Sequence, residues 1–305
     1  MPDNYSLDKK KIIFVGNSYT YYGQTVLEKS QKHLTLESRQ ADKGYFYQLC
    51  KRNGMEVEVT NWTFGGHSLD HLFGGCCSAK RGCDGVDHKK YLTDLCYDYV
   101  VLQPGSGQAS SDNFLYELDN IMKLFRKENP EVRFVLLIPY SAYGKIGSRK
   151  FLQSSILNSL GELDEQGVTI VDWGGLVMDI LEGRVRIPNS KIVYGKNSFV
   201  IRKSEADGFH PNQLSGYLTT LMTFSAITGA SPVCQPYDFC NDPSLRPSGG
   251  SQIFFSFDSF ISTFYTWGGE KTNYPEIFAS RVDMAGLQAL AEDHLNKKAY
   301  RNYKF

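Results

Sequence analysis

The chain has no excess of charge of either sign. Lys and Arg together number 33, and Asp and Glu together also number 33, so the formal net charge is zero. The sequence also has no long run of basic residues. A nucleic-acid binder, by contrast, usually presents a clustered basic face. The composition therefore predicts no nucleic-acid partner.

Long apolar runs are also missing. No stretch approaches the roughly 18 consecutive apolar residues of a membrane span, so we expect no membrane insertion. Residues 1–11 are polar and lack the apolar core of a secretory signal. The localisation stays open between a cytoplasmic protein and an exported one whose signal has been removed.

The seven cysteines lack the pattern of a metal site or of complete pairing. An odd number cannot all pair within one chain. Cys76, Cys77 and Cys83 share a Gly-rich loop but not the paired C-x-x-C spacing typical of zinc sites. Cys234 and Cys240 would close a small loop only in an exported protein. We expect no metal and no other cofactor.

What is present is an alternation of strand-like and helix-like segments over 305 residues, enough for one large α/β domain. Short apolar runs predict strands at 11–15, 55–63, 98–103, 132–139 and 168–171. Helical spacing predicts helices at 44–53, 113–128, 151–166 and 212–228. This order is typical of a five-stranded parallel sheet covered on both faces, with ligands bound beyond the carboxyl ends of the strands.

Two stretches do not fit the alternation. Residues 184–206 are polar and β-like, which predicts a hairpin flanking the segment around His210. Residues 232–277 are rich in aromatics, Pro and Gly, and suit a lid, an edge addition or an oligomer surface. A helix is predicted over 281–298. We expect a main domain over 1–231 and an extension over 232–305 packed on it; the oligomeric state is not indicated.

The first candidate for chemistry is Ser18, in the segment IIFVGNSYT. It follows the first predicted strand, where the N–H groups of a following helix can stabilise a developing oxyanion. Gly16 permits a tight turn there. The alternative is that Asn17 and Ser18 only cap the next helix.

The second candidate is the pair Asp207 and His210, in SEADGFHPNQ before a predicted helix. A serine nucleophile needs a base, and histidine serves near neutral pH. A carboxylate three residues earlier can orient the imidazole. The alternative is a turn at Asp207 with His210 as a polar surface residue.

Together, G-N-S-Y after the first strand and D-G-F-H-P-N near the end of the α/β pattern resemble the SGNH (GDSL-like) hydrolase family over about residues 11–228. The resemblance implies a flavodoxin-like three-layer fold and ester hydrolysis through an acyl-serine. It also implies Ser18 as nucleophile, His210 as base and Asp207 as its orienting partner. Asn17 stands where that family more often has Asp, which weakens the match slightly.

The middle blocks of the family match less well. Its second block supplies a glycine whose N–H enters the oxyanion hole. Gly66, after the second predicted strand, matches this glycine, and the N–H of Ser18 is the other main-chain donor that the resemblance implies. The third block usually supplies an asparagine, but this chain reads LQPGSGQAS. Gln103 is the proposed replacement, because its amide can donate in the same way, and Gln108 and Ser106 are weaker candidates. Asn17, Tyr19 and His67 are weaker candidates for substrate contact.

These observations favour a serine esterase that removes a small acyl group such as acetyl, with a carbohydrate ester as substrate class. A lipase or thioesterase of the same family is an alternative. A non-catalytic carbohydrate-binding protein on the same scaffold is another, and a separation of Ser18 from His210 beyond hydrogen-bond reach would favour it. A nucleotide-handling domain is disfavoured, because GNSYT lacks the glycines and lysine of phosphate-binding loops.

Overall fold

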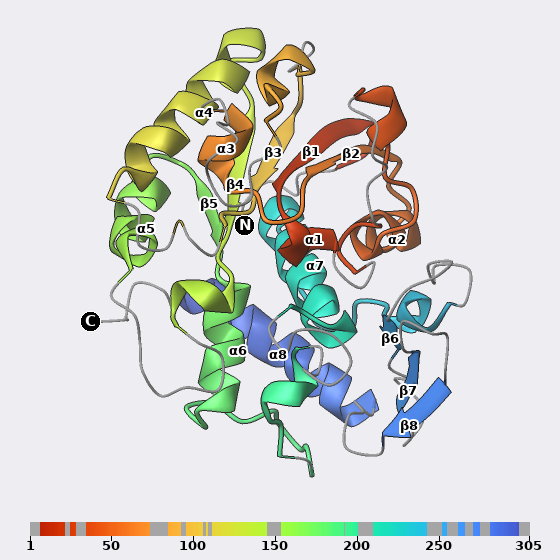
Figure 1. Ribbon diagram of the computed structural model, residues 1–305. Coiled ribbons are helices and arrows are strands. Elements are labelled where there is room, and N and C mark those ends of the chain that lie inside the picture. Colours follow the sequence, from red (N-terminus) through yellow and green to blue (C-terminus); the bar gives the residue numbers. More distant parts are fainter. Residues whose placement is uncertain are drawn as a thin grey trace.

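The computed structural model describes residues 7–21, 25–28, 35–73, 85–92, 96–105, 108, 112–144, 154–191, 193–200, 210–242, 252–254, 262–265, 271–274 and 281–298. Figure 1 shows a central sheet with helices packed on both of its faces. Among the described residues, no helix is both long and apolar enough to cross a membrane.

Five parallel strands form the central sheet, in the order β2-β1-β3-β4-β5. The strands are β1 (Lys10–Gly16), β2 (Val57–Thr63), β3 (Tyr99–Leu102), β4 (Arg133–Leu137) and β5 (Thr169–Val171). The run Ile12–Val15 of the inner strand β1 is buried throughout, as expected for a parallel strand covered on both faces. The predicted five-stranded parallel sheet is confirmed, and its strand order is that of the flavodoxin-like fold.

Helices form the outer layers. They are α1 (Ser18–Tyr21), α2 (Tyr45–Arg52), α3 (Leu69–Phe73), α4 (Phe114–Glu128), α5 (Ser155–Glu165), α6 (Trp173–Leu181), α7 (Gln213–Thr228) and α8 (Arg281–Lys297). The helices α3, α4 and α5 lie together on one side of the sheet, and α2 and α7 lie on the other (Figure 1). α4 buries Leu118, Ile121 and Phe125 at the predicted helical spacing. The predicted helices corresponding to α2, α4, α5, α7 and α8 are confirmed.

α7 carries the chain away from the candidate site and is buried along nearly its whole length. Asn212 caps its first turn by accepting hydrogen bonds from Leu214 N at 3.0 Å and Ser215 N at 3.2 Å. Buried hydroxyl groups inside the helix donate to carbonyls four residues earlier, as Thr219 does at 2.8 Å. These hydroxyl groups of α7 are thus hydrogen-bonded within the core, whereas Gln213, Thr220 and Ser225 keep buried polar atoms without a partner among the described residues. Asn212 holds the start of the helix.

The C-terminal part adds a second, antiparallel sheet and the last helix. The strands β6 (Gln252–Phe254), β7 (Ser262–Tyr265) and β8 (Lys271–Tyr274) pair in sequence order. α8 packs against α6 and α7 on the lower side of the molecule in Figure 1. The division of the chain at residue 231, and the role of the extension, stay predictions.

The predicted hairpin over 184–206 is wrong for the part that the structure describes. Between residues 184 and 200 the described chain has one short 3-10 turn (Lys196–Ser198) and a single bridge from Val200 to Pro211. Pro188 lacks an N–H donor for a sheet ladder, and Asn189 next to it adopts φ 61°. Residues 201–206 lie outside the described part.

The described cysteines are unpaired, and one helix was not predicted. Among the described cysteines, Cys50, Cys96, Cys234 and Cys240 are free thiols, so no loop is closed between the last two. The Gly-rich cysteine loop lies outside the described residues. α6 was not predicted, because its sequence WGGLVMDIL is apolar on all sides and shows no helical period.

Candidate active site

The site begins where β1 ends. Gly16 is the last residue of the strand, and Ser18 is the first residue of α1, only partly buried at the carboxyl edge of the sheet. Asn17, between them, is 2% exposed. This is the edge at which parallel α/β sheets bind ligands.

Asn17 ties the loop after β1 to the loop after β3. Its Nδ2 donates to the carbonyl of Gln103 at 3.3 Å and to that of Pro104 at 3.1 Å. Its Oδ1 accepts from Tyr19 N at 3.1 Å. Because its amide is buried and bonded to the main chain, Asn17 occupies a structural position here, whereas the sequence suggested a substrate contact.

Gly16 lies so close to the neighbouring strand that a side chain would not fit. A Cβ added there would lie 2.6 Å from Gln103 Cβ and 2.8 Å from Gln103 O. Gly16→Ala is therefore expected to lower the free energy of unfolding by about 1–3 kcal/mol, through overpacking of the sheet. Urea unfolding of the purified protein measures this change.

Gly161→Ala is the matched control for that experiment. Gly161 lies in α5, and a Cβ there would meet nothing within 4 Å. Alanine should stabilise this helix by roughly 0.5–1 kcal/mol. Equal and small effects of the two substitutions would contradict the close approach at Gly16.

Ser18 and His210 meet, although they are 192 residues apart in the chain. Their Oγ and Nε2 atoms lie 2.7 Å apart, within hydrogen-bond reach. His210 stands just before Asn212, the capping residue of α7, and its ring packs 5.7 Å from that of Tyr19. Tyr19 is itself buried against Tyr140, at 5.6 Å. The aromatic packing fixes the imidazole beside the hydroxyl. Asp207 lies outside the described residues.

The glycines after β2 form a tight turn beside Ser18. Phe64 N donates to Gly16 O at 2.9 Å, and His67 N donates to Phe64 O at 3.2 Å. Gly66 between them has φ 77°, the left-handed region that favours glycine. Among the loop and cap hydrogen bonds of the described residues, none is donated by the main-chain N–H of Ser18 or Gly66. Both N–H groups are therefore available to a ligand.

Gln103 directly follows β3 and is 1% exposed. Its Nε2 donates to Pro104 O at 3.1 Å, and its Oε1 is buried with no partner among the described residues. One amide hydrogen is thus occupied by the main chain. The second remains for a substrate, so its role as an oxyanion donor stays a prediction.

In the side chain of Gln108, four residues beyond Pro104, both polar atoms are hydrogen-bonded within the protein, unlike in that of Gln103. Its Oε1 accepts from Gly105 N at 2.9 Å and from Leu69 N at 3.0 Å, and its Nε2 donates to Glu117 Oε2 at 3.1 Å. The side chain therefore clamps the loop after β3 to the start of α3 and to α4.

A buried arginine that the sequence analysis did not single out supports the glycine turn. Arg39 is 2% exposed, and its guanidinium lies 3.9 Å from the ring centre of Phe64 and donates to Asn61 O at 3.1 Å. Burial lowers the pKa of Arg39 to about 10, and the charge of Tyr21 opposes this shift, so the cation persists at neutral pH. On the other side, a Cβ on Gly65 would lie 2.8 Å from Tyr21 Oη. The turn is held between α1 and this cation.

The histidines after β2 lie in an aromatic cluster. His67 is 6% exposed, its Nδ1 is 3.0 Å from Gly65 O, and its ring lies 5.6 Å from that of Phe64. His71 lies 6.3 Å from His67 between ring centres. Within the described part of the chain, no three His, Cys, Asp or Glu side chains are grouped so as to hold a metal ion. These contacts give His67 a structural position in the turn.

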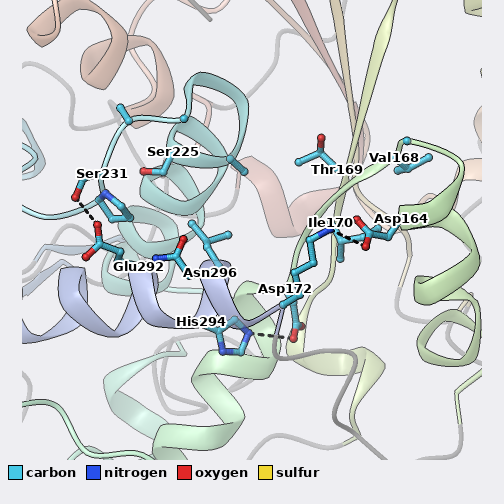
Figure 2. Close-up of a pocket in the computed structure, with 17 residues that line it drawn as sticks. Asp164, Val168, Thr169, Ile170, Asp172, Ser225, Ser231, Glu292, His294 and Asn296 are labelled. Carbon is cyan, nitrogen blue, oxygen red and sulfur yellow. Dashed lines mark hydrogen bonds and ion pairs between the residues drawn. The ribbon is translucent and has the colours of Figure 1, made fainter. Parts of the chain in front are cut away.

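A large cavity lies elsewhere, along β5. It has a volume of about 540 Å³ and is lined by residues of β5, α7 and α8, including Thr169, Ser225 and Glu292. Figure 2 shows these side chains around the cavity, with His294 directed at Asp172. Neither Ser18 nor His210 lines it. The candidate site is therefore defined by the contact between Ser18 and His210 and not by this cavity.

No family model matches the chain, and no curated protein matches it in sequence. The similar solved structures include LAE5, an α/β hydrolase enzyme from the metagenome of Lake Arreo, Spain, at 18% identity and TM-score 0.44, covering 74% of this chain and 97% of that one. They also include Axe2, an acetylxylan esterase from Geobacillus stearothermophilus, at 14% identity and TM-score 0.47, covering 74% and 97%. A putative GDSL-like lipase from Parabacteroides merdae matches at 15% identity and TM-score 0.47, covering 74% and 99%. These likenesses concern the fold, and the chemistry of this chain is inferred from its own side chains.

Proposed function

We propose that the protein is a serine esterase of the SGNH kind, with Ser18 as nucleophile and His210 as general base. The observation that carries the proposal is the 2.7 Å contact between Ser18 Oγ and His210 Nε2 at the carboxyl edge of the sheet. A binding protein needs no such contact between a hydroxyl and an imidazole. This distance also speaks against the alternative of a non-catalytic carbohydrate-binding protein.

The proposed reaction has two steps. His210 Nε2 takes the hydroxyl proton while Ser18 Oγ bonds to the ester carbonyl carbon, and the alcohol then leaves with that proton. Water next attacks the acyl-serine and gives its proton to His210. The carboxylic acid leaves as the proton returns to Ser18 Oγ. No cofactor takes part in either step.

The oxyanion of each tetrahedral intermediate is proposed to accept from the main-chain N–H groups of Ser18 and Gly66. The availability of both N–H groups and the left-handed turn at Gly66 support this assignment. Gln103 is proposed as a third donor through its remaining amide hydrogen. Asp207 is proposed to accept from His210 Nδ1, on the strength of the D-G-F-H spacing alone.

The proposed substrate is an ester of a small acyl group such as acetyl with a carbohydrate. The sequence shows no long apolar lid of the kind found in long-chain lipases, which supports a small acyl group, and the Gln-bearing third block and the Tyr-rich loops support a carbohydrate. A lipase or thioesterase of the same family is distinguished by its acyl-chain preference. Hydrolysis rates for p-nitrophenyl acetate, butyrate, octanoate and palmitate decide between them, and a preference for octanoate or palmitate would contradict the proposal.

A fluorophosphonate probe tests the nucleophile directly. Ser18 Oγ is expected to bond to phosphorus as fluoride leaves, with the hydroxyl proton passing to His210. Peptide mass spectrometry should place one label on Ser18, with the native protein labelled and the urea-unfolded protein unlabelled. Label on a different residue of the native protein, or hydrolysis of p-nitrophenyl acetate that continues after Ser18 is fully labelled, would contradict the proposal.

A further inference from the structure

A second cavity lies between α3 and α4. Its volume is about 550 Å³, within the range of small-ligand pockets. Phe73, Ile121 and Leu124 supply its apolar lining. The two helices lie against each other on one side of the sheet (Figure 1). None of the assigned site residues lines this cavity, so it is a separate feature of the molecule.

Close packing connects this cavity to Ser18. Gly16, two residues before Ser18, lies against Gln103 at the end of β3. In the same loop, a Cβ on Gly105 would lie 3.0 Å from Ser68 Cα, immediately before α3. α3 and α4 follow the carboxyl ends of β2 and β3, so the beginnings of both helices lie toward the edge of the sheet that carries Ser18.

The polar part of the lining suits a neutral ligand rich in hydroxyl groups. Tyr116 and Asn120 lie on one stripe of α4 at helical spacing, Asn113 directly precedes that helix, and all three are exposed. Tyr116 is 70% exposed, so a large ring stands uncovered at the cavity. An exposed tyrosine offers both an apolar face and a hydroxyl. Side-chain amides both donate and accept, as sugar hydroxyls do.

The charges in the lining balance. Asp70 and Glu117 are opposed by Lys89 and Lys123, and this balance gives no preference for an anion or a cation. His71 also lines the cavity, and its Nδ1 is buried with no hydrogen-bond partner among the described residues.

We propose that this cavity binds the sugar chain of the substrate, next to the residue whose acyl group is removed at Ser18. Its role as a substrate subsite rests on the proposed esterase function. The ligand is a neutral oligosaccharide, held by its sugar faces on Tyr116 and by its hydroxyl groups on Asn113 and Asn120.

Gln108 links the subsite to the site. Glu117, which lines the cavity, accepts from Gln108 Nε2, and the same side chain holds Gly105 N and Leu69 N. An occupied subsite therefore lies one hydrogen-bonded side chain away from the loop that follows Gln103.

The test compares two kinds of ester, acetylated tetraoses and p-nitrophenyl acetate, as substrates of one enzyme. The kcat/KM of Tyr116→Ala is measured on partially acetylated xylotetraose, mannotetraose and cellotetraose, and on p-nitrophenyl acetate. We expect the ratio of the best oligosaccharide value to the p-nitrophenyl acetate value to fall about five- to tenfold, mainly through KM. Asn120→Ala should lower the same ratio. Tyr91→Ala is the matched control, because Tyr91 is also exposed (39%) but does not line the cavity, and its ratio should not change.

A binding measurement tests the subsite independently of ester hydrolysis. Calorimetric titration of the Ser18→Ala protein with the deacetylated tetraoses should show binding that Tyr116→Ala, added to Ser18→Ala, weakens about five- to tenfold. Such binding together with a wild type that hydrolyses no ester would overturn the esterase and leave the sugar site in place. Ester hydrolysis with an unchanged ratio in both cavity variants, and no binding of any tetraose, would overturn the subsite and leave the esterase.

Discussion

Ser18→Ala is expected to lower kcat for p-nitrophenyl acetate by about 10⁴- to 10⁶-fold, because it removes the atom proposed to form the acyl intermediate. His210→Ala should cost a similar factor, since the 2.7 Å contact makes the two residues act as one unit. The double variant should therefore be no slower than the slower single variant. Steady-state rates with purified proteins, corrected for the spontaneous hydrolysis of the ester, measure all three.

Two controls make this result specific. Ser159→Ala changes a serine on α5, whose Oγ donates to Ser155 O at 2.8 Å within the helix, and should leave the rate unchanged. Thermal unfolding of each variant shows whether a loss of rate follows a loss of fold. A folded Ser18→Ala protein that keeps more than about a hundredth of the wild-type kcat would place the nucleophile elsewhere.

The order of strands and helices along the chain was predictable, because each is marked by a short local pattern of apolar residues. Ile12–Val15 is a continuous apolar run that ends at a glycine, and such a run is typical of a buried parallel strand. Once the sheet is parallel, the ends of its strands share one edge, so loops at Ser18 and His210 can meet there. The 2.7 Å contact is the kind of proximity that this topology permits.

The supports of the site were not predictable, because they join residues without a fixed spacing. The stacking of Arg39 on Phe64 depends on how two loops fold onto α1, and no sequence pattern marks a cation over a ring. The orientation of Gln103 depends in the same way on which carbonyl is nearest to its amide. Sequence therefore indicates which residues can react, whereas packing decides what holds them in place.

The buried pair of His294 and Asp172 is another contact between residues far apart in the sequence, and we expect it to stabilise the fold. The residues are 122 positions apart, and His294 Nε2 lies 3.1 Å from Asp172 Oδ2 with side chains 5% and 1% exposed (Figure 2). The His294 Nδ1 atom is 4.0 Å from Asp179 Oδ2, and Asp179 also accepts from Arg184 Nε at 2.5 Å. The pair joins α8 to the segment where β5 ends and α6 begins.

His294→Ala is expected to lower the free energy of unfolding by roughly 3–5 kcal/mol at pH 6, because it leaves the buried Asp172 charge without its partner. Urea unfolding measures this loss. The matched control is Asp293→Asn, which breaks an exposed pair with Lys297 one residue earlier on the same helix. That exposed pair contributes about 0–1 kcal/mol, so the control should stay close to the wild type.

The effect should depend on pH in one direction. Burial lowers the pKa of His294, but the hydrogen bond and charge of Asp172 and the charge of Asp179 outweigh burial and raise it above its ordinary value of 6.5. A raised pKa means that the folded protein holds the proton more tightly than the unfolded chain does. The stabilisation is therefore complete below about pH 6.5 and is lost as the pH rises through the pKa of the folded state.

Asp172→Asn removes the negative charge that faces His294 but can keep the hydrogen bond that caps α6. Asp172 Oδ1 accepts from Gly175 N at 3.0 Å at the start of α6, and an asparagine oxygen can keep that bond. This variant should lose the part of the pH dependence that comes from His294, and its free energy of unfolding should change less than that of the wild type between pH 6 and pH 9. A wild type whose stability does not fall over this range, or a fall that persists equally in Asp172→Asn and His294→Ala, would show that the pair does not anchor α8 through its proton.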